Sequence, residues 1–356
     1  MAYTTINKST DYFNTVLYTG NNSSPRTITG VGFQPDMNWS KIRSESADHW
    51  LQDAVRGANK IIRPNGTDDE LVNGSGGYLS SFNADGYVIA SGSSNNNNFN
   101  KSSGTYVSWN WKANGAGSAN TDGSINSTVS VNTTAGFSIV SFTGTGSNAT
   151  VGHGLGVVPQ MVIIKDRTSG NDWFIYNKNV GATKYLKLND NSAEASSSTL
   201  FQDTDPTNQV FSIGTNGNVN TNGNTYIAYC FAEKVGYSKF GSYVGNGNAD
   251  GTFVYTGFKP SWLMIKGTGS TDNWHIFDIK RNPYYPTSSS YGGMATRLMA
   301  NRNDADDLSQ GGFEFLSNGL KMTTSWAGGN NSGEKFIYMA FGQSLVGSNN
   351  IPCTAR

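Results

Sequence analysis

The sequence Gly257-Phe258-Lys259-Pro260-Ser261-Trp262-Leu263-Met264-Ile265-Lys266 has two counterparts earlier in the chain. They are Gly32-Phe33-Gln34-Pro35-Asp36-Met37-Asn38-Trp39-Ser40-Lys41 and Gly156-Val157-Val158-Pro159-Gln160-Met161-Val162-Ile163-Ile164-Lys165. The later two copies predict a turn, a proline at the start of a strand, and then a buried apolar run. The first copy is interrupted by Asn38 and Ser40. Recurrence after about 100 to 125 residues indicates repeated domains rather than a solenoid.

Three further markers recur in the same order as this stretch. A tryptophan follows each proline by 15, 14 and 14 residues, at Trp50, Trp173 and Trp274. An alternating strand follows at 105–111, 225–231 and 335–341, with a large side chain at every second position. An aromatic residue, then Thr or Val, then Gly opens each copy, at 18–20, 142–144 and 243–245. We therefore predict an all-β chain of three tandem antiparallel β-sandwiches.

The composition favours an extracellular-type or virion-type β protein over a cytosolic enzyme. The 356 residues include 43 glycines and 9 prolines, which predict many turns and little helix. Charged residues are 14% of the chain and aromatic residues 12%. The formal net charge is zero, and no basic cluster stands out, so nothing favours nucleic-acid binding.

The two cysteines and the N-terminus bear on where the protein resides. Cys230 lies in a strand predicted to be buried, and Cys353 lies near the end, so we expect neither a disulfide framework nor a zinc site. The polar N-terminus carries no secretory signal, and no apolar run is long enough to span a membrane. A virion component made in a host cytoplasm fits both the extracellular-type composition and the absence of a secretory signal.

The markers divide the chain into three units with terminal extensions. We expect an N-terminal arm at 1–17 and unit one at 18–112. A linker and the first strand of the next copy follow at 113–135. Unit two spans 136–236, unit three 237–343, and a C-terminal tail 344–356. Asp85-Gly86 and Asn318-Gly319 predict hairpin turns.

Recurring residues are predicted to be structural. We assign this role to Pro35, Pro159, Pro260, Trp50, Trp173, Trp274, Lys41, Lys165 and Lys266. The tryptophans could stack on sugars, but a feature shared by every copy is more typical of core.

Other polar residues give little sign of catalysis. His49, His153 and His275 lie in separate units or turns, and we expect them to be structural. Asp53 with Arg56, and Asp278 with Arg281, share a spacing that suits either a ligand site or, as we favour, an ion pair holding a turn. No nucleophile elbow, phosphate loop or zinc-protease motif is present. We expect no catalytic residue, no metal and no cofactor.

The longest insert, 281–310, belongs to unit three and carries the candidate ligand-binding residues. Loops on a rigid scaffold are where binding residues concentrate. We therefore predict ligand contacts from Tyr284, Tyr285, Tyr291 and Arg297. The oxygen-rich segments 120–123 and 246–251 could suit calcium, but both lack the terminal Glu of an EF-hand loop, and we expect plain turns.

Several segments resemble repeats in structural proteins of tailed phages, especially marine and cyanobacterial phages. They are 30–36, 109–112, 136–140, 151–159 and the ending 351–356. These repeats look like concanavalin-type, laminin-G-like sandwich modules with a jelly-roll arrangement. The resemblance covers nearly the whole chain, and it implies a virion protein without catalytic residues.

Two functions follow from that resemblance. The first is a tail-fibre or adhesin component that binds host-surface glycan through exposed loops. The alternative is a non-adhesive capsid decoration or tail scaffold. An enzyme such as a depolymerase ranks third, because no acid pair or nucleophile is visible. We expect other virion proteins as partners and a homotrimer, with the two terminal segments lying on neighbours.

Overall fold

The computed structural model describes residues 4–93, 99–281, 296–307 and 311–346. Strands dominate these residues, and each helix is about one turn long. The prediction of an all-β chain is confirmed.

Unit one contains two packed sheets and a short ribbon. The larger sheet has the strand order β1-β9-β3-β4, the smaller one β2-β8-β7, and β5 pairs with β6. The elements are η1 (Ser9–Asp11), β1 (Phe13–Thr19), β2 (Arg26–Thr29), β3 (Met37–Ile42), β4 (Trp50–Asp53), β5 (Lys60–Ile61), β6 (Leu71–Val72), β7 (Tyr78–Asn83), β8 (Gly86–Ala90) and β9 (Thr105–Trp111). The unit begins at β1, so its first strand lies partly in the segment predicted to be an arm.

Unit two has the widest sheet, ordered β10-β11-β12-β19-β14-β15-β16-β17, and a pair β13-β18. Its elements are β10 (Ser118–Asn120), β11 (Ser127–Asn132), β12 (Phe137–Thr143), β13 (Ala149–Gly152), β14 (Met161–Asp166), β15 (Trp173–Asn177), β16 (Lys184–Lys187), β17 (Ala195–Ser196), α1 (Ser198–Phe201), β18 (Val210–Ile213), α2 (Gly217–Asn220) and β19 (Thr225–Phe231). The stretch 113–135 is therefore more than a linker. Its alternation at Val129 and Val131 places β11 beside β12, and β10 extends the same edge.

Unit three repeats the arrangement with sheets β20-β27-β22-β23-β24 and β21-β26-β25. Its elements are β20 (Ser238–Val244), β21 (Phe253–Tyr255), β22 (Lys259–Gly267), β23 (His275–Asp278), β24 (Leu298–Met299), β25 (Phe313–Leu316), β26 (Gly319–Met322), α3 (Ala327–Asn330) and β27 (Lys335–Gln343). Both predicted hairpins are present, but their two-residue turns are Ala84-Asp85 and Ser317-Asn318, so each predicted turn glycine is the first residue of the second strand.

The order of the four central strands is the same in every unit. The opening strand (β1, β12 or β20) pairs with the last strand (β9, β19 or β27). The last strand also pairs with the proline strand, which begins near the repeated proline (β3, β14 or β22). The proline strand in turn pairs with the tryptophan strand, which begins at or next to the repeated tryptophan (β4, β15 or β23). This shared order makes residues equivalent by register. Trp39, Ile163 and Met264 occupy one such position, facing Trp109, Tyr229 and Met339 respectively.

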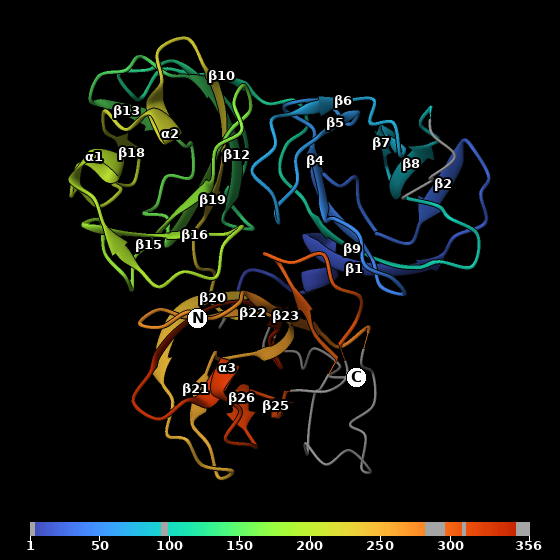
Figure 1. Cartoon of the computed structure of the whole chain (residues 1–356), viewed down its shortest axis with the longest axis vertical. Helices are drawn as coiled ribbons and strands as arrows, with labels where there is room; N and C mark the ends of the chain where they lie inside the picture. The colour runs from blue at the N-terminus through green and yellow to red at the C-terminus, as the bar shows by residue number, and fades with distance from the viewer. Residues whose placement is uncertain (1–3, 94–98, 282–295, 308–310, 347–356) are drawn as a thin grey trace.

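The larger sheets are buried on both faces. One face of each packs against its own smaller sheet, forming a separate apolar cluster in each unit. The opposite faces meet in a single cluster that draws residues from all three units. Figure 1 shows the units as three lobes around a common centre. Burial on both faces explains why β14 and β22 read as apolar runs rather than as alternating strands.

Loops close the three units into a ring. The segment that follows the tryptophan strand of each unit reaches the proline strand of another unit and makes an equivalent main-chain hydrogen bond. These bonds run from Glu70 N to Arg167 O (3.0 Å), from Glu194 N to Thr268 O (2.7 Å) and from Asp306 N to Arg43 O (2.8 Å). Unit one thus contacts unit two, unit two contacts unit three, and unit three contacts unit one. This is a head-to-tail arrangement that closes after three steps.

The described part of the N-terminal arm packs within its own chain. Ile6 belongs to the shared core, and the main-chain N–H of Ser9 donates to the Oε1 of Gln343 over 2.6 Å. The two ends of the ring therefore meet beside β27.

Candidate functional site

The recurring lysines hold main-chain carbonyl groups in the interior. Lys41, Lys165 and Lys266 are fully buried, and each Nζ donates to the carbonyl of the next residue, over 2.6, 2.8 and 2.7 Å. Two of them also donate to a neighbouring unit, Lys165 to the carbonyl of Thr67 (3.1 Å) and Lys266 to that of Asn191 (3.3 Å). Burial lowers the pKa of each lysine to about 8. All three lysines thus hold the end of their own strand, and Lys165 and Lys266 also link it to a neighbouring unit.

The tryptophan marker is shifted by one residue in unit one. Trp173 and Trp274 lie in the shared core, and their Nε1–H groups donate to Arg63 O (2.9 Å) and Lys187 O (2.7 Å) of the neighbouring units. Trp50 instead packs in the outer cluster of unit one. The strand register makes His49 the equivalent of Trp173 and Trp274. Spacing from the proline suggested Trp50, but adjacent residues of a strand face opposite sides of the sheet.

The Asp–Arg pairs are buried ion pairs at contacts between units. Asp53 bonds to the Nε of Arg56 over 2.5 Å, and Asp278 to that of Arg281 over 2.6 Å. The side chains of all four residues are fully buried. Asp53 also accepts the hydroxyl of Tyr229, from unit two, over 2.7 Å. No open face remains on either pair, so the structure favours the turn-holding role.

The second pair has the same kind of partner, and the middle unit lacks the whole set. Trp109 of unit one donates its Nε1–H to Asp278 over 3.1 Å. In unit two the equivalent residues are Asn177 and Val180, and the donor position is occupied by Met339 of unit three. Val180 and Met339 pack in the shared apolar core. Where the carboxylate is absent, its cation and its hydrogen-bond donor are absent too.

Recurring asparagines are structural positions that the sequence analysis missed. Asn100, Asn220 and Asn330 are buried, and each accepts a main-chain N–H just after the glycine that opens its unit. Each precedes the aromatic residue of the last strand by six positions, which is the signal that could have revealed them. The opening glycines are required by contact, because a Cβ on Gly144 would lie 2.4 Å from the carbonyl oxygen of Thr221.

The three histidines are buried and separate. The Nδ1 of His49 accepts the Nε1–H of Trp39 over 2.9 Å, and the Nδ1 of His153 accepts the main-chain N–H of Leu155 over 3.1 Å. His275 contacts Asp272 over 3.1 Å. Burial lowers the pKa of all three imidazoles, most strongly that of His49. Their arrangement supports the structural role predicted for them.

The interior of unit one is more polar than that of its counterparts. Asn38 donates to Asn110 over 2.8 Å, and Ser40 donates to Asn38 over 2.6 Å, in a fully buried layer between the two sheets. Beside this layer, the side-chain amide of Gln52 is fully buried and has no hydrogen-bond partner. Unit two has Val162 and Ile164 at the positions of Asn38 and Ser40. Asn38 and Ser40, which interrupt the apolar run of the first copy, therefore face the space between the two sheets of unit one.

The insert of unit three lies largely outside the described residues. Tyr284, Tyr285 and Tyr291 all fall there. Arg297 is described, and it is engaged: its Nη2 bonds to Asp307 over 2.7 Å, and its guanidinium lies 5.4 Å from the ring centroid of Trp326. That ring also packs edge-on against His275 at 4.7 Å. Arg297 therefore anchors the end of the insert to the turn that carries α3.

The described residues also bear on the predictions about metal, calcium, the cysteines and membrane spans. Within the described residues, no group of three His, Cys, Asp or Glu side chains could hold a metal ion. In the two oxygen-rich segments, Asn120 donates to Asp122 over 2.8 Å and Asn246 donates to the carbonyl of Asp250 over 3.0 Å, as turns do. Cys230 is buried and free, and Cys353 lies outside the described residues. No helix in the described ranges is long and apolar enough to cross a membrane.

The centre of the ring is apolar. A small space there is lined by side chains of all three units, including Trp39, Trp111, Trp173, Tyr229 and Trp262. The lining is mostly apolar, and it includes Trp111 and Trp262, whose Nε1 atoms are buried without a hydrogen-bond partner among the described residues.

Comparison with known proteins places the chain in a family. A family model described as a domain of unknown function, DUF7483, matches residues 8–344. The chain belongs to the DUF7483 family. The DUF7483 match starts just before η1 and ends just after β27, so it takes in the whole three-unit ring rather than one repeat. A search of curated proteins finds no match.

Proposed function

We propose that the protein is a non-enzymatic structural component of a tailed-phage virion, of fibre or adhesin type, that presents a host-binding surface for cell-surface glycan. The proposal includes the finer fold prediction, in which each unit is a concanavalin-like sandwich with a jelly-roll arrangement. It also includes residence in the virion and contact with other virion proteins.

One observation supports this proposal above others. The recurring polar residues form hydrogen bonds and ion pairs within and between units, as the buried Asp–Arg pairs and lysines illustrate. The units also differ at their surfaces and in their inserts, as the exposed Phe253 and Tyr255 of unit three illustrate. A rigid scaffold that carries variable exposed segments is typical of binding proteins, and the resemblance to phage structural proteins supplies the setting.

The test is location and binding. Antibody raised against the purified protein should label particles of a phage that carries the gene at the parts that touch the host. The purified protein should bind host cells and compete with adsorption. If the protein is absent from particles, or if particles lacking it adsorb normally, the adhesin proposal is wrong.

The edges of the larger sheets favour the alternative of a capsid decoration or tail scaffold. In unit two, β11 and β10 extend the sheet beyond β12, but β1 and β20 are outer strands of their sheets. Such strands can pair with a strand of a neighbouring protein. Labelling spread over the capsid or tail, with no cell binding by the purified protein, would support this function.

The homotrimer stays a prediction. Light scattering at micromolar concentration should give three times 38.2 kDa if it is correct, and 38.2 kDa if the chain is a monomer in solution. The ring already buries the inner faces of three sheets within one chain, so a trimer would have to use other surfaces.

A further inference from the structure

Two exposed aromatic side chains lie side by side on unit three. Phe253 is 44% exposed and Tyr255 is 59% exposed, and they are the two most exposed aromatic residues in the described part of the chain. Both belong to β21, and residues two apart on a strand face the same side. Val254, between them, points into the core of the unit. The outer face of the smaller sheet thus presents two adjacent rings.

The neighbouring strands leave these rings open and surround them with charged groups. Phe253 pairs in register with Lys321, and Tyr255 pairs with Gly319, which has no side chain to cover it. A Cβ on Gly319 would lie 3.0 Å from two atoms of the Phe253 ring, so this ring extends over the glycine. Lys321 bonds to Asp250 over 2.5 Å and pairs in register with Glu314 of β25.

The aromatic residues are not needed for the fold, because unit one manages without them. The registers make Thr27 and Thr29 of β2 the equivalents of Phe253 and Tyr255, and Gly86 the equivalent of Gly319. The glycine is a requirement of the fold: a Cβ would lie 2.0 Å from the carbonyl oxygen of Ile28 at Gly86, and 2.2 Å from that of Val254 at Gly319. Only the aromatic pair is particular to unit three.

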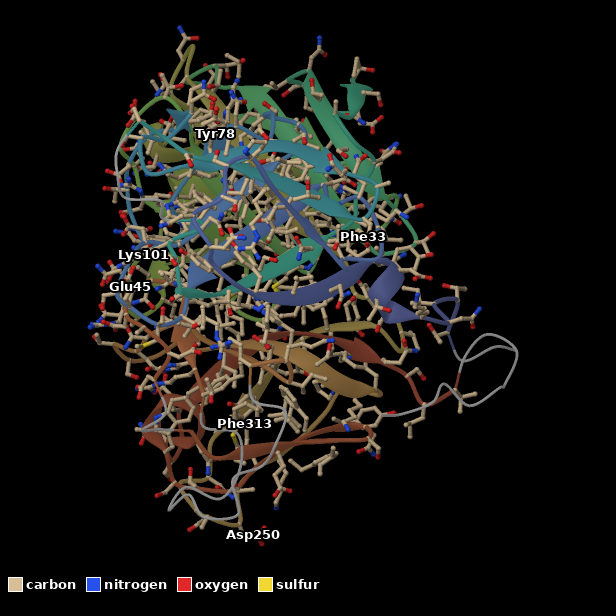
Figure 2. The ribbon with its side chains drawn as sticks, turned by 90° about the vertical axis from the view of Figure 1, so that its right-hand side faces the viewer. Phe33, Glu45, Tyr78, Lys101, Asp250 and Phe313 are labelled. Atoms are coloured by element: carbon tan, nitrogen blue, oxygen red, sulfur yellow. The ribbon has the colours of Figure 1, made fainter. Side chains whose placement is uncertain are left out.

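The pair lies at an outer end of the molecule. In Figure 1, β21 and β26 are in the lower part of the lobe formed by unit three, away from the other two lobes. Figure 2 shows Asp250, the ion-pair partner of Lys321, at the lower tip. A large ligand attached to a surface could therefore reach this face without touching units one and two.

The size and charge of the face select among ligands. Given their exposures, the two rings offer about 200 Å² of surface, whereas a stable protein interface needs about 800 Å² per partner. This area is suited to one or two sugar rings. One lysine and two carboxylates surround it, which disfavours phosphate, nucleic acid and anionic membranes. The same charged groups can exchange hydrogen bonds with hydroxyl groups.

We propose that the face formed by Phe253, Tyr255, Gly319, Lys321 and Glu314 is a binding site for neutral hexose glycan. The apolar faces of successive sugars stack on the two rings, and their hydroxyl groups bond to the charged side chains. This inference deepens the proposed function and rests on it, because it names the surface and the chemical class that an adhesin of this kind would use.

Calorimetric titration tests the site with defined probes: cellohexaose, mannohexaose and delipidated O-polysaccharide from the host. The variant F253A/Y255A should bind the recognised probe at least tenfold more weakly than the unchanged protein. The matched variant T27A/T29A, at the equivalent positions of unit one, should bind with unchanged affinity. Tyr255→Phe should stay within threefold, because it keeps the ring. Equal denaturation midpoints for all variants show that the fold is retained.

A gain-of-site variant makes the test sharper. T27F/T29Y/V88K copies onto β2 and β8 the aromatic pair and the lysine that faces Phe253 in register, and it should raise the stoichiometry from one glycan to two. Undiminished binding by F253A/Y255A, or a concentration-dependent dimer that this variant abolishes, overturns the inference.

The two proposals can fail separately. If the unchanged protein and F253A/Y255A bind host cells equally well, the adhesin function stands and this site is wrong. If F253A/Y255A loses glycan binding but the protein is absent from virions, the site stands and the virion function is wrong.

Discussion

At the scale of single residues, the repeats show which side chains depend on one another. Asp53, Arg56 and Tyr229 form one buried set, and the middle copy replaces the equivalent set by Asn177, Val180 and Met339. A buried carboxylate requires a cation and donors, whereas the set with Asn177 is uncharged and requires no cation, since the amide oxygen of Asn177 accepts the main-chain N–H of Asn179. The two solutions are alternatives, and a mixture of them should be worse than either.

We therefore expect the single variant Arg56→Val to lower the free energy of unfolding by about 3 to 5 kcal/mol, because it leaves the Asp53 carboxylate buried without its cation. The triple variant D53N/R56V/Y229M copies the uncharged set of unit two, and it should lower the free energy of unfolding clearly less than the single change does. Urea denaturation of both measures the difference. A triple variant at least as unstable as the single one would contradict the exchangeability of the two sets.

The buried asparagines make a second prediction at this scale. Asn220 accepts from Thr145 N (2.8 Å) and donates to Ser147 O (2.6 Å) and Gly214 O (2.8 Å). Asn220→Ala leaves these groups unpaired and should cost about 2 to 4 kcal/mol. Asn222→Ala, at an exposed position of the same turn, is the control and should cost less than about 0.5 kcal/mol. Equal midpoints for the two variants would show that the buried side chain is dispensable.

At the scale of elements, the loops add polar contacts between the units to the apolar core that the sheets share. Glu70, on the loop of unit one, lies between Arg56 of its own unit (3.1 Å) and Arg167 of unit two (2.9 Å). These contacts lower the pKa of its carboxyl group against the opposing effect of burial. The equivalent Glu194 bonds instead to Lys184 of its own unit. Equivalent loops therefore hold their neighbours with different strength.

Glu70→Gln should reduce the free energy of unfolding by about 3 kcal/mol, because two largely buried guanidinium groups lose their shared carboxylate. Glu194→Gln, in which a more exposed pair is lost, should cost less than about 1 kcal/mol. Thermal and urea denaturation of the two variants form a matched comparison. The opposite ranking would contradict the stronger hold of the loop of unit one compared with that of unit two; Asp306 of unit three makes the same kind of double ion pair as Glu70.

At the scale of the whole molecule, one apolar core is shared by three units. No unit can leave the ring without exposing the inner face of its larger sheet. We expect unfolding to be a single transition, with coincident curves for tryptophan fluorescence and far-ultraviolet circular dichroism. Separate transitions for the two signals would show that the units are independent domains.

The buried histidines predict a dependence of stability on pH. Because their pKa values in the folded protein are lowered by burial, the unfolded chain binds more protons than the folded chain below about pH 6.5. The free energy of unfolding should therefore fall as the pH is lowered from 7 to 5, by at most about 1.4 kcal/mol per pH unit for each histidine. His49→Gln, which keeps an acceptor for Trp39, should flatten the slope. A slope unaffected by this change would exclude His49 as a contributor.

Local patterns predicted much of this structure, because strand alternation, glycine-containing turns and the proline strand are encoded in neighbouring residues. The hairpins at Asp85-Gly86 and Asn318-Gly319 are examples. Patterns failed where one position decides the face of a strand. The spacing that aligned Trp50 with Trp173 was wrong by one residue, and that error moves the side chain from the shared core to the outer cluster.

Contacts between distant segments could not be predicted from such patterns. Nothing local links Glu70 to Arg167, or Trp109 to Asp278, since these partners lie in different repeats. The exposure of Phe253 and Tyr255 was equally hidden, because an alternating aromatic strand looks the same whichever face is buried. The candidate tyrosines of the insert stay untested predictions, since they lie outside the described residues.

Closure of the ring also constrains how the gene can change. In an open array such as a solenoid, recombination can add or delete a repeat, because each repeat touches only its neighbours. Here the loop of unit three returns to unit one through Asp306 and Arg43. A fourth copy would have no place, and loss of a copy would leave two incompatible ends. A change in copy number therefore breaks contacts between units, whereas divergence of faces and inserts leaves these contacts in place.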